Sequence, residues 1–187
     1  DPVEAMISGV QQSQVNVRGG YSFAQGLRGM LRSDPDVLAV GELRDAETVD
    51  IAARAALSGH LVVATLHAAN AHQAVNRLRD LGLSDLMLSA VLLGVVNQRL
   101  VARTCDYCGG RGIDAKGACC RHCMGNGTIG RMGVQELWIP TEAERAQIEL
   151  GTNSVTLRQH ARAAGFRELS IVAREKGVAL SDGEEHL

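Results

Sequence analysis

The chain has 187 residues, of which 45% are hydrophobic and 21% charged, the usual balance of a globular protein. This length can bury one good core, and because only 3% of the residues are aromatic, that core must be aliphatic. The net charge of -2 gives no general attraction to nucleic acid or anionic membrane, so we expect no nucleic-acid partner. The longest apolar stretch, residues 86–96, is too short to span a bilayer.

The amino-terminal part of the chain combines an irregular segment with a predicted helix. Residues 1–20 are acidic, then rich in Gln, then rich in Gly, which predicts a loop with one or two short strands. Ser22 is a predicted N-cap, followed by apolar residues at helical spacing. Arg28 and Arg32 project from one side of this helix, where solvation, a subunit interface and a nucleotide contact all remain open.

Two short apolar runs are predicted to be buried strands. Residues 37–40 follow a turn that contains proline, and residues 60–67 form the second run, with a histidine at each end. Asp45 is predicted to cap a helix between them, so the order predicts a βαβ unit and a parallel sheet. Glu42 would then lie at the carboxyl edge of the sheet, where such folds bind ligands. From this stretch alone, a solvated charge cluster is the simpler interpretation of Glu42.

Further helices are predicted after the second strand. Asn70 is a predicted N-cap for a helix that ends at Gly82. Ser84 begins a longer helix, apolar on almost every face, that extends to Arg103 and is expected to belong to the core.

The last third of the chain returns to regular structure. Residues 133–138 are predicted to form a strand that returns to the main body. Capping-box spacing predicts a helix over residues 141–150, and two shorter helices are predicted to end near Gly165 and Gly177. The polar tail, residues 181–187, is expected to fray.

All five cysteines lie within one short segment of the chain. Two C-x-x-C pairs, Cys105 with Cys108 and Cys120 with Cys123, are separated by 11 residues. Two such pairs provide the four thiolates of a tetrahedral Zn²⁺ shell, and the clustering fits a metal site better than a disulfide framework. Because a closed four-thiolate shell has no open position, we expect the zinc to be structural rather than catalytic.

One ligand of this predicted site remains ambiguous. Cys119 precedes Cys120 and would be an alternative ligand, although its spacing to Cys123 is less suitable. We expect His122 to face solvent rather than bind the metal.

Four motifs in this order resemble those of the type II secretion and type IV pilus assembly ATPases. Residues 1–4 resemble the family's aspartate box and residues 31–45 its Walker B signature. Residues 59–67 resemble its histidine box, and the cysteine pairs are followed by the family's glycine-rich segment at residues 130–136. The resemblance covers essentially the whole chain.

The resemblance implies an α/β fold: a truncated RecA-like P-loop NTPase domain with a parallel-rich sheet. Residues 1–103 would belong to the ATPase core, residues 104–130 would form a small tetracysteine zinc-binding insertion, and residues 131–187 a strand with a helical C-terminal subdomain. It further implies a homo-hexamer in the cytoplasm, peripheral to the bacterial inner membrane. Its implied partners are an inner-membrane platform protein and a cytoplasmic adaptor, and ATP hydrolysis would drive pilin-like subunits into a filament.

The same resemblance assigns three catalytic residues. Glu42 matches the Walker B glutamate, which acts with Mg²⁺ and the attacking water, and His67 matches the histidine that reads the γ-phosphate of ATP. Glu4 matches an acid of the aspartate box near the catalytic water. This set fits the chemistry, since phosphoryl transfer depends mainly on positioned water and charge neutralisation.

Four further residues are assigned to the Mg²⁺ and ATP site. Asp1 matches the second acid of the aspartate box, and Asp36 and Arg44 would hold the geometry of the Walker B segment. His60 lies in the histidine box, with a simple hydrogen bond to the backbone as its alternative role.

The sequence also departs from the family pattern. No G-x-x-x-x-G-K-[ST] loop occurs, the amino-terminal domain is absent, and the chain does not begin with Met. We therefore expect the carboxy-terminal half of a motor domain, without ATPase activity of its own. The gap between the cysteine pairs is short for the family, and Ala39 and Ala68 are minor differences.

Two alternatives remain to be weighed. A pilus-retraction ATPase would share the aspartate, Walker B and histidine boxes but typically lacks the four cysteines. The C-x-x-C-x-Gly-x-Gly pattern at Cys105 and at Cys120 also resembles the zinc repeats of DnaJ-type polypeptide-binding modules, but the flanking sequence fits the ATPase family throughout. The choice between secretion, pilus assembly and DNA uptake is left open.

Overall fold

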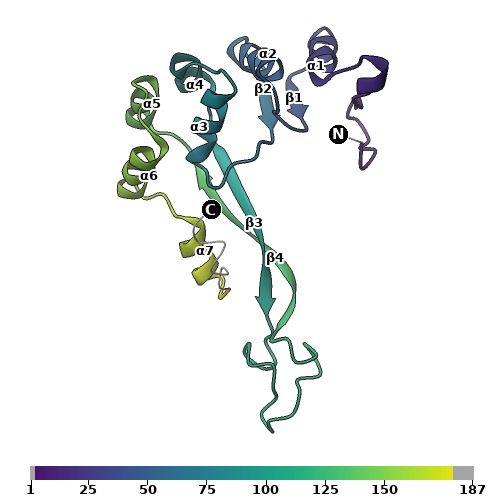
Figure 1. Cartoon of the computed structure of the whole chain (residues 1–187), viewed down its shortest axis with the longest axis vertical. Coiled ribbons are helices and arrows are strands. Elements are labelled where there is room, and N and C mark those ends of the chain that lie inside the picture. The colour runs from purple at the N-terminus through teal and green to yellow at the C-terminus, as the bar shows by residue number, and fades with distance from the viewer. Residues whose placement is uncertain (1–2, 179–187) are drawn as a thin grey trace. The chain divides into compact units, whose positions relative to one another are not determined.

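The structure, a computed structural model, describes residues 3–178 and divides into two compact units (Figure 1). Of the described residues, the first unit contains 3–68, 72–93 and 140–157, and the second contains 69–71, 94–139 and 158–178. Asp1 and the tail predicted at residues 181–187 lie outside the described residues.

The first helices of the chain begin where the sequence predicts. A short 3₁₀ helix, η1 (Val17–Gly19), precedes α1 (Phe23–Leu31), and Ser22 caps α1 in a capping box with Gln25. Arg28, on the exposed side of α1, forms an ion pair with Glu47 at 2.7 Å. Both side chains of this pair are more than half exposed, and the three roles considered for Arg28 stay predictions.

A parallel pair of strands forms the centre of the first unit. β1 (Val37–Val40) and β2 (Leu61–Ala64) pair in parallel, and α2 (Ala46–Leu57) connects them, so the predicted βαβ unit is confirmed. Asp45 caps α2 by accepting the N–H of Thr48 at 2.8 Å. Figure 1 shows α1 and α2 beside this pair, and both helices contact the strands.

The two strands are only half-buried, so the prediction that both are buried is wrong for one face. Leu38 and Val40 are buried, whereas the side chains of Val37 and Val63 are 56% and 55% exposed. Residues alternate between the faces of a strand, so the more buried residues of β1 and β2 share one face and the exposed residues share the other.

The third helix begins later than predicted. Asn70 is not its N-cap, because α3 begins three residues further on (Gln73–Asp80). The N–H of Ala71 donates to the buried carboxylate of Glu136 at 2.8 Å. The predicted end is confirmed, since Gly82 follows the helix with φ of +92°.

The long helix predicted from Ser84 to Arg103 is wrong beyond its first two turns. Ser84 does cap a helix, α4 (Asp85–Val91), but the chain then enters a strand, β3 (Val95–Thr104). Side chains alternate between partly buried and exposed along the first half of β3. Pairing with a second strand and the β-branched valines favour the extended form over a helix.

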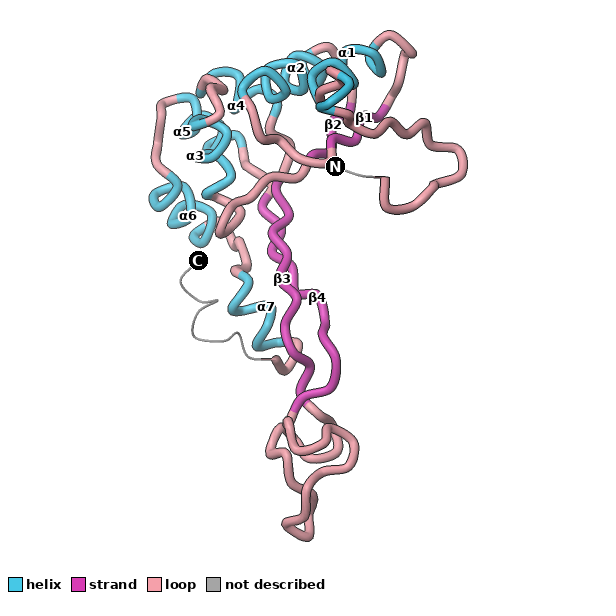
Figure 2. Tube along the Cα trace, turned by 45° about the vertical axis from the view of Figure 1, so that its right-hand side comes forward, coloured by secondary structure: helices cyan, strands magenta, loops and turns pink. Residues whose placement is uncertain are grey.

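A long antiparallel ribbon forms the framework of the second unit. β3 pairs with β4 (Thr128–Trp138), which confirms the strand predicted at residues 133–138 and extends it towards the cysteines. Helix α7 (Leu169–Glu175) packs against β4. The core between them contains Val101, Val134, Leu169, Ala173 and Val178. Figure 2 shows a loop without helix or strand at the far end of the ribbon.

Glu136 on β4 is the polar centre of this unit. Its side chain is buried and accepts three hydrogen bonds, from the N–H of Ala71, the amide of Asn97 and the N–H of Leu169. The carboxylate thus satisfies an otherwise unpaired donor at the start of α7.

The remaining helices agree with the sequence. α5 (Glu142–Glu149) begins with the predicted capping box of Thr141 and Glu144. α6 (Ser154–Ala163) and α7 end near Gly165 and Gly177, as predicted. None of the helices in the described residues is long and apolar enough to cross a membrane.

Candidate functional site

Glu42 and His67 meet at the carboxyl edge of the parallel strands. Glu42 follows the end of β1 by two residues and His67 follows the end of β2 by three, so the parallel pairing carries both to the same edge. Nε2 of His67 lies 3.3 Å from Oε1 of Glu42. Nε and Nη2 of Arg44 lie 2.7 Å and 2.6 Å from Oε2 of Glu42. Both carboxylate oxygens of Glu42 therefore have a basic neighbour.

The electrostatics of this group keep Glu42 ionised. The hydrogen bond from Arg44 lowers the pKa of Glu42 below its usual value, and it raises the pKa of Arg44 in return. The side chain of Glu42 is only 13% exposed, whereas that of His67 is 91% exposed. The arrangement presents a shielded carboxylate and an accessible imidazole to a ligand at the edge of the sheet.

The other residues predicted for this site are less tightly grouped. Glu4 is exposed in the irregular segment before η1, and Asp36 is exposed just before β1. Within residues 3–178, neither carboxylate forms a hydrogen bond or ion pair with Glu42 or His67. The catalytic role of Glu4 and the geometric role of Asp36 stay predictions, as does the role of Asp1.

His60 lies at the opposite end of β2 from His67. Its Nδ1 is 3.0 Å from the carbonyl oxygen of Ala55 and 3.1 Å from the hydroxyl of Ser58. The structure thus supplies the backbone hydrogen bond that was the alternative role for His60, and its place in a nucleotide site stays a prediction.

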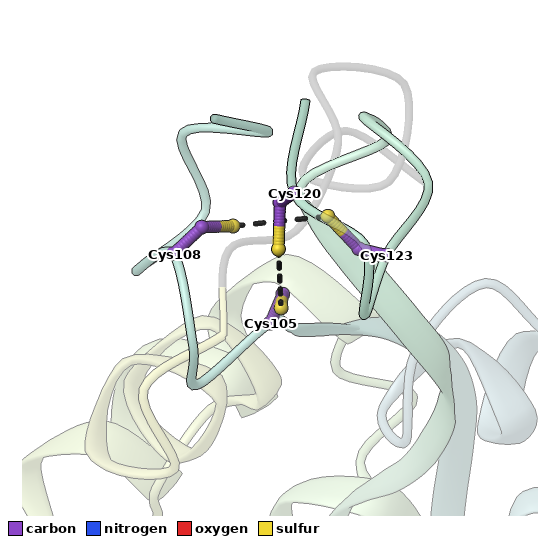
Figure 3. A group of neighbouring side chains, drawn as sticks. All are labelled: Cys105, Cys108, Cys120 and Cys123. Atoms are coloured by element: carbon purple, nitrogen blue, oxygen red, sulfur yellow. Dashed lines mark hydrogen bonds between the residues drawn. The ribbon is translucent and has the colours of Figure 1, made fainter. Parts of the chain in front are cut away.

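Four cysteine side chains converge at the end of the β3–β4 ribbon (Figure 3). The Sγ atoms of Cys105, Cys108, Cys120 and Cys123 all lie within 4.8 Å of one another, and all four residues are buried. The Sγ atoms of Cys105 and Cys120 are 4.0 Å apart, and those of Cys108 and Cys123 are 3.7 Å apart. Cys119 is exposed and lies outside the group, so the ambiguity between Cys119 and Cys120 is resolved in favour of Cys120.

The donor set fits a zinc ion. In a tetrahedron with Zn–S bonds of about 2.3 Å, the sulfur atoms are about 3.8 Å apart, close to the separations observed. Two backbone donors support the thiolates, since Gly112 N–H lies 3.3 Å from Sγ of Cys108 and Gly127 N–H lies 3.2 Å from Sγ of Cys123. Such bonds to the sulfur stabilise a coordinated thiolate.

The pKa values of the Cys108 and Cys123 thiols are shifted in opposite directions. Burial raises the pKa of the Cys123 thiol to about 11. Burial also acts against ionisation of Cys108, but the Gly112 amide and the neighbouring thiols bring the pKa of Cys108 down to about 7. A divalent cation would supply the charge that favours four thiolates together.

The two cysteine pairs are related by an approximate two-fold symmetry in their hydrogen bonds. Cys105 N–H donates to the carbonyl of Gly127, and Cys120 N–H donates to the carbonyl of Gly112, each at 2.9 Å. A Cβ on Gly112 would lie 2.3 Å from the oxygen of Gly125, and one on Gly127 would lie 2.3 Å from the oxygen of Gly110. Glycine is therefore required at both positions by close approach of the backbones.

An exposed aromatic pair joins the two C-x-x-C pairs. The rings of Tyr107 and His122 stack with centroids 3.3 Å apart and an angle of 5° between their planes. Both residues are exposed, so the prediction that His122 faces solvent rather than the metal is confirmed. Each ring occupies the same position in its C-x-x-C pair, which extends the two-fold relation to the surface.

Sequence reasoning missed two polar residues that organise these regions. Thr65 contacts the Glu42 segment through its backbone and its hydroxyl, as described below. Glu136 lay in the glycine-rich segment but was not assigned a role. The available signal was that the alternating pattern of the predicted strand places this acidic residue on the buried face. A buried carboxylate needs several hydrogen-bond donors, so the pattern indicates a structural role.

The chain belongs to the type II/IV secretion system protein family, whose model matches residues 1–182. It is 40% identical to the type IV pilus assembly ATPase PilB of Thermus thermophilus over 95% of the chain and 22% of that protein. It is 43% identical to the type II secretion system protein HxcR of Pseudomonas aeruginosa over 90% of the chain and 36% of that protein. The chain thus spans between a fifth and two-fifths of the length of these relatives.

The solved structures agree on the fold. The pilus retraction motor PilT with bound ADP superimposes with a TM-score of 0.64 and 30% identity, over 88% of this chain and 43% of that one. The ATPase DotB of Legionella pneumophila has the same fold at 23% identity and a TM-score of 0.62, over 88% of this chain and 41% of that one. The α/β fold expected from the sequence, with its four-cysteine insertion, is confirmed.

Proposed function

We propose that this chain is the carboxy-terminal part of an ATP-hydrolysing motor that powers pseudopilus or pilus assembly. The contact of Glu42 with His67 at the carboxyl edge of the parallel strands is the observation that carries this proposal. Its relatives include an ATPase of pilus assembly and an ATPase of type II secretion. An active site at this edge agrees with the position at which open α/β sheets bind ligands.

Glu42 would orient the water that attacks the γ-phosphate. Its lowered pKa makes the carboxylate a weak proton acceptor, so it acts by accepting a hydrogen bond from the water and fixing the line of attack. Both of its oxygens have partners in this structure, and the one beside His67 has the longer contact. The Oε1 side is therefore the easier one to release towards the water. Mg²⁺, when bound with ATP, would neutralise charge on the phosphates.

The other predicted residues complete the proposed site. His67 is exposed and can donate from its imidazole to the γ-phosphate, while Arg44 holds Glu42 from the other side. Glu4 and Asp1 would act near the water and Mg²⁺. Asp36 and His60 belong to the same proposal with weaker structural support. Asp36 is exposed before β1, and His60 contacts the carbonyl oxygen of Ala55 at the opposite end of β2.

The proposed motor is a cytoplasmic homo-hexamer at the inner membrane. We propose that it acts on a membrane platform protein and is held by a cytoplasmic adaptor, and that ATP hydrolysis is coupled to filament growth. The buried cysteine cluster favours the assembly or secretion branch over the retraction branch, and the relatives with about 40% identity are assembly and secretion proteins. The family match includes the cysteine segment, which argues against a separate DnaJ-type module.

The proposal predicts that Glu42→Gln abolishes ATP hydrolysis in the full-length protein. The amide keeps the size of the side chain but loses the carboxylate charge, so kcat should fall by about 100-fold or more while nucleotide still binds. Phosphate release and binding of a fluorescent nucleotide would measure the two effects. The isolated 187-residue chain should show no ATPase activity.

Glu149→Gln is the matched control, because Glu149 is an exposed glutamate at the end of α5. It should leave hydrolysis unchanged. Full activity of the Glu42→Gln protein, or steady turnover by the isolated chain that Glu42→Gln removes, would contradict the proposal.

A further inference from the structure

Thr65 contacts the chain on both sides of Glu42. It follows β2 directly, and its N–H donates to the carbonyl of Val40 at 3.3 Å. Its carbonyl accepts the N–H of Leu43 at 2.9 Å, and its hydroxyl donates to the carbonyl of Gly41. A single residue therefore makes three bonds to a segment of four residues that includes Glu42.

The spacing of these bonds shows an irregularity directly after the end of the regular parallel ladder, which pairs residues 37–40 with residues 61–64. In a regular parallel pair, one residue donates to position j−1 and accepts from position j+1 of the neighbouring strand. Thr65 instead donates to Val40 and accepts from Leu43, so Gly41 and Glu42 both occupy a place where one residue is usual. This two-against-one count is that of a β-bulge, a feature that redirects a side chain.

The hydroxyl of Thr65 completes this bulge. The extra residue of a bulge leaves a backbone group without a partner in the ladder. Here the carbonyl of Gly41 is that group, and the threonine hydroxyl reaches it. A side chain with a donor at this position thus fixes the peptide that immediately precedes Glu42, whereas an apolar side chain of equal size would leave it free to rotate.

The same residue also fixes the start of the segment that carries His67. Thr65 precedes His67 by two residues, so its backbone bonds set the distance between the His67 and Glu42 segments. The contact of 3.3 Å between Nε2 of His67 and Oε1 of Glu42 depends on that distance. An error of about 1 Å in such a placement can reduce a rate by about 100-fold.

We propose that the hydroxyl of Thr65 is a positioning group for Glu42, acting through the bulge at Gly41 and without contact to the substrate. This inference rests on the proposed function, because it deals with how the carboxylate of that site is aimed. The competing explanation is an exposed hydroxyl with no role beyond solvation, since Thr65 lies at the surface.

Two substitutions separate the hydroxyl from the rest of the side chain. Thr65→Val keeps the shape and the backbone bonds but removes the donor, and Thr65→Ser keeps the donor but removes the methyl group. In the full-length ATPase, Thr65→Val should lower kcat by about ten-fold or more with KM for ATP changed by less than about two-fold. Thr65→Ser should stay within about two-fold of the wild type in both constants.

A measurement on the chain itself supplies a readout other than activity. The ¹³C signal of the Glu42 carboxyl and the ring signals of His67 should shift in Thr65→Val and stay at their wild-type positions in Thr65→Ser. Thr152→Val is the matched control, because it removes a hydroxyl bond to Gln147 away from this edge. Thr152→Val should leave these signals and the kinetic constants unchanged. Its melting temperature shows how much stability is lost when one hydroxyl hydrogen bond is removed.

The outcomes are distinguishable. Wild-type kcat in Thr65→Val, or equal loss in Thr65→Val and Thr65→Ser, would overturn the positioning role even if Glu42→Gln is inactive. Activity of Glu42→Gln would instead overturn the proposed function. Should Thr65→Val fail to fold, Thr65→Ala removes the same donor and takes its place in both measurements.

Discussion

Arg44 is the main cause of the lowered pKa of Glu42. Two of its guanidinium nitrogens contact the same carboxylate oxygen of Glu42, at 2.7 Å and 2.6 Å. The pKa of Glu42 is lowered chiefly by this hydrogen bond, with His67 as a weaker influence. At the scale of a single residue, Arg44 therefore favours the ionised form of Glu42.

Substitution of Arg44 should move the titration of Glu42. In Arg44→Gln the pKa of Glu42 should rise towards the ordinary value of a glutamate, because both the hydrogen bond and the positive charge weaken. A ¹³C titration of the Glu42 carboxyl in the isolated chain would measure the change. Since the folded pKa is lowered, any stabilisation by the pair is present above the ordinary pKa and is lost as pH falls through the lowered value.

Arg54→Gln provides the control for this titration. Arg54 pairs with Asp50 on α2 through a similar contact, at 2.8 Å, and lowers the pKa of Asp50. Its replacement should shift the titration of Asp50 and leave that of Glu42 in place. A Glu42 midpoint that does not move in Arg44→Gln would contradict the role given to the guanidinium.

At the scale of an element, Gly112 and Gly127 allow the backbones of the two cysteine pairs to approach each other closely. Gly112→Ala should weaken metal retention strongly, because φ is +73° and the new Cβ would lie 2.3 Å from a backbone oxygen. Gly117→Ala is matched to it, with φ of +77° but no atom within 4 Å of the new Cβ. Competition with a chromogenic chelator would compare the two. Equal zinc affinity in both variants would show that the close backbone approach does not matter.

Local signals in the sequence predicted most elements of the first unit. Ser22, Asp45 and Thr141 each cap the helix that their spacing predicted, because a cap depends only on residues within one turn. The strand β3 was missed because the apolar run of residues 86–96 overlaps its first residues, and because its pairing with β4 depends on residues 24 to 43 positions later. Periodicity within one window cannot show that partner.

The candidate site was predictable to the extent that it depends on motifs. The four ligands of the cysteine cluster follow from two C-x-x-C pairs, and the edge position of Glu42 follows from the order of strand, helix and strand. The role of Thr65 was not predictable, since its hydroxyl bond is defined by a tertiary contact. For Glu136 the alternating strand could indicate burial, but not the three donors that surround the carboxylate. The secondary-structure propensity of a local stretch of sequence does not encode such contacts.

At the scale of the whole molecule, the proposed metal site and the proposed catalytic edge belong to different units. The cysteine cluster is a separate small core, accompanied only by Ile129 among the partly buried apolar residues of the described chain that pack against it. Glu42 and His67 both belong to the first unit. The stability of the cysteine loop should therefore depend on the metal far more than that of β1 and α2 does.

Metal removal should test this division. After treatment with a chelator, peptides from residues 105–127 should exchange their amide hydrogens much faster, whereas peptides from β1 and α2 should keep their protection. Hydrogen exchange measured by mass spectrometry gives the protection of both sets of peptides in one experiment. Metal analysis before the chelator is added should give one zinc per chain. Equal loss of protection in both units would contradict the prediction.

The two-fold relation within the cysteine loop also bears on how an ion would be held there. Cys105–Gly112 and Cys120–Gly127 are offset by 15 residues and exchange equivalent backbone bonds, as the two halves of a symmetric dimer do. One half alone offers two thiolates, and two identical copies would offer the complete shell. The loop therefore needs both halves for metal binding, since neither half alone completes a four-thiolate shell.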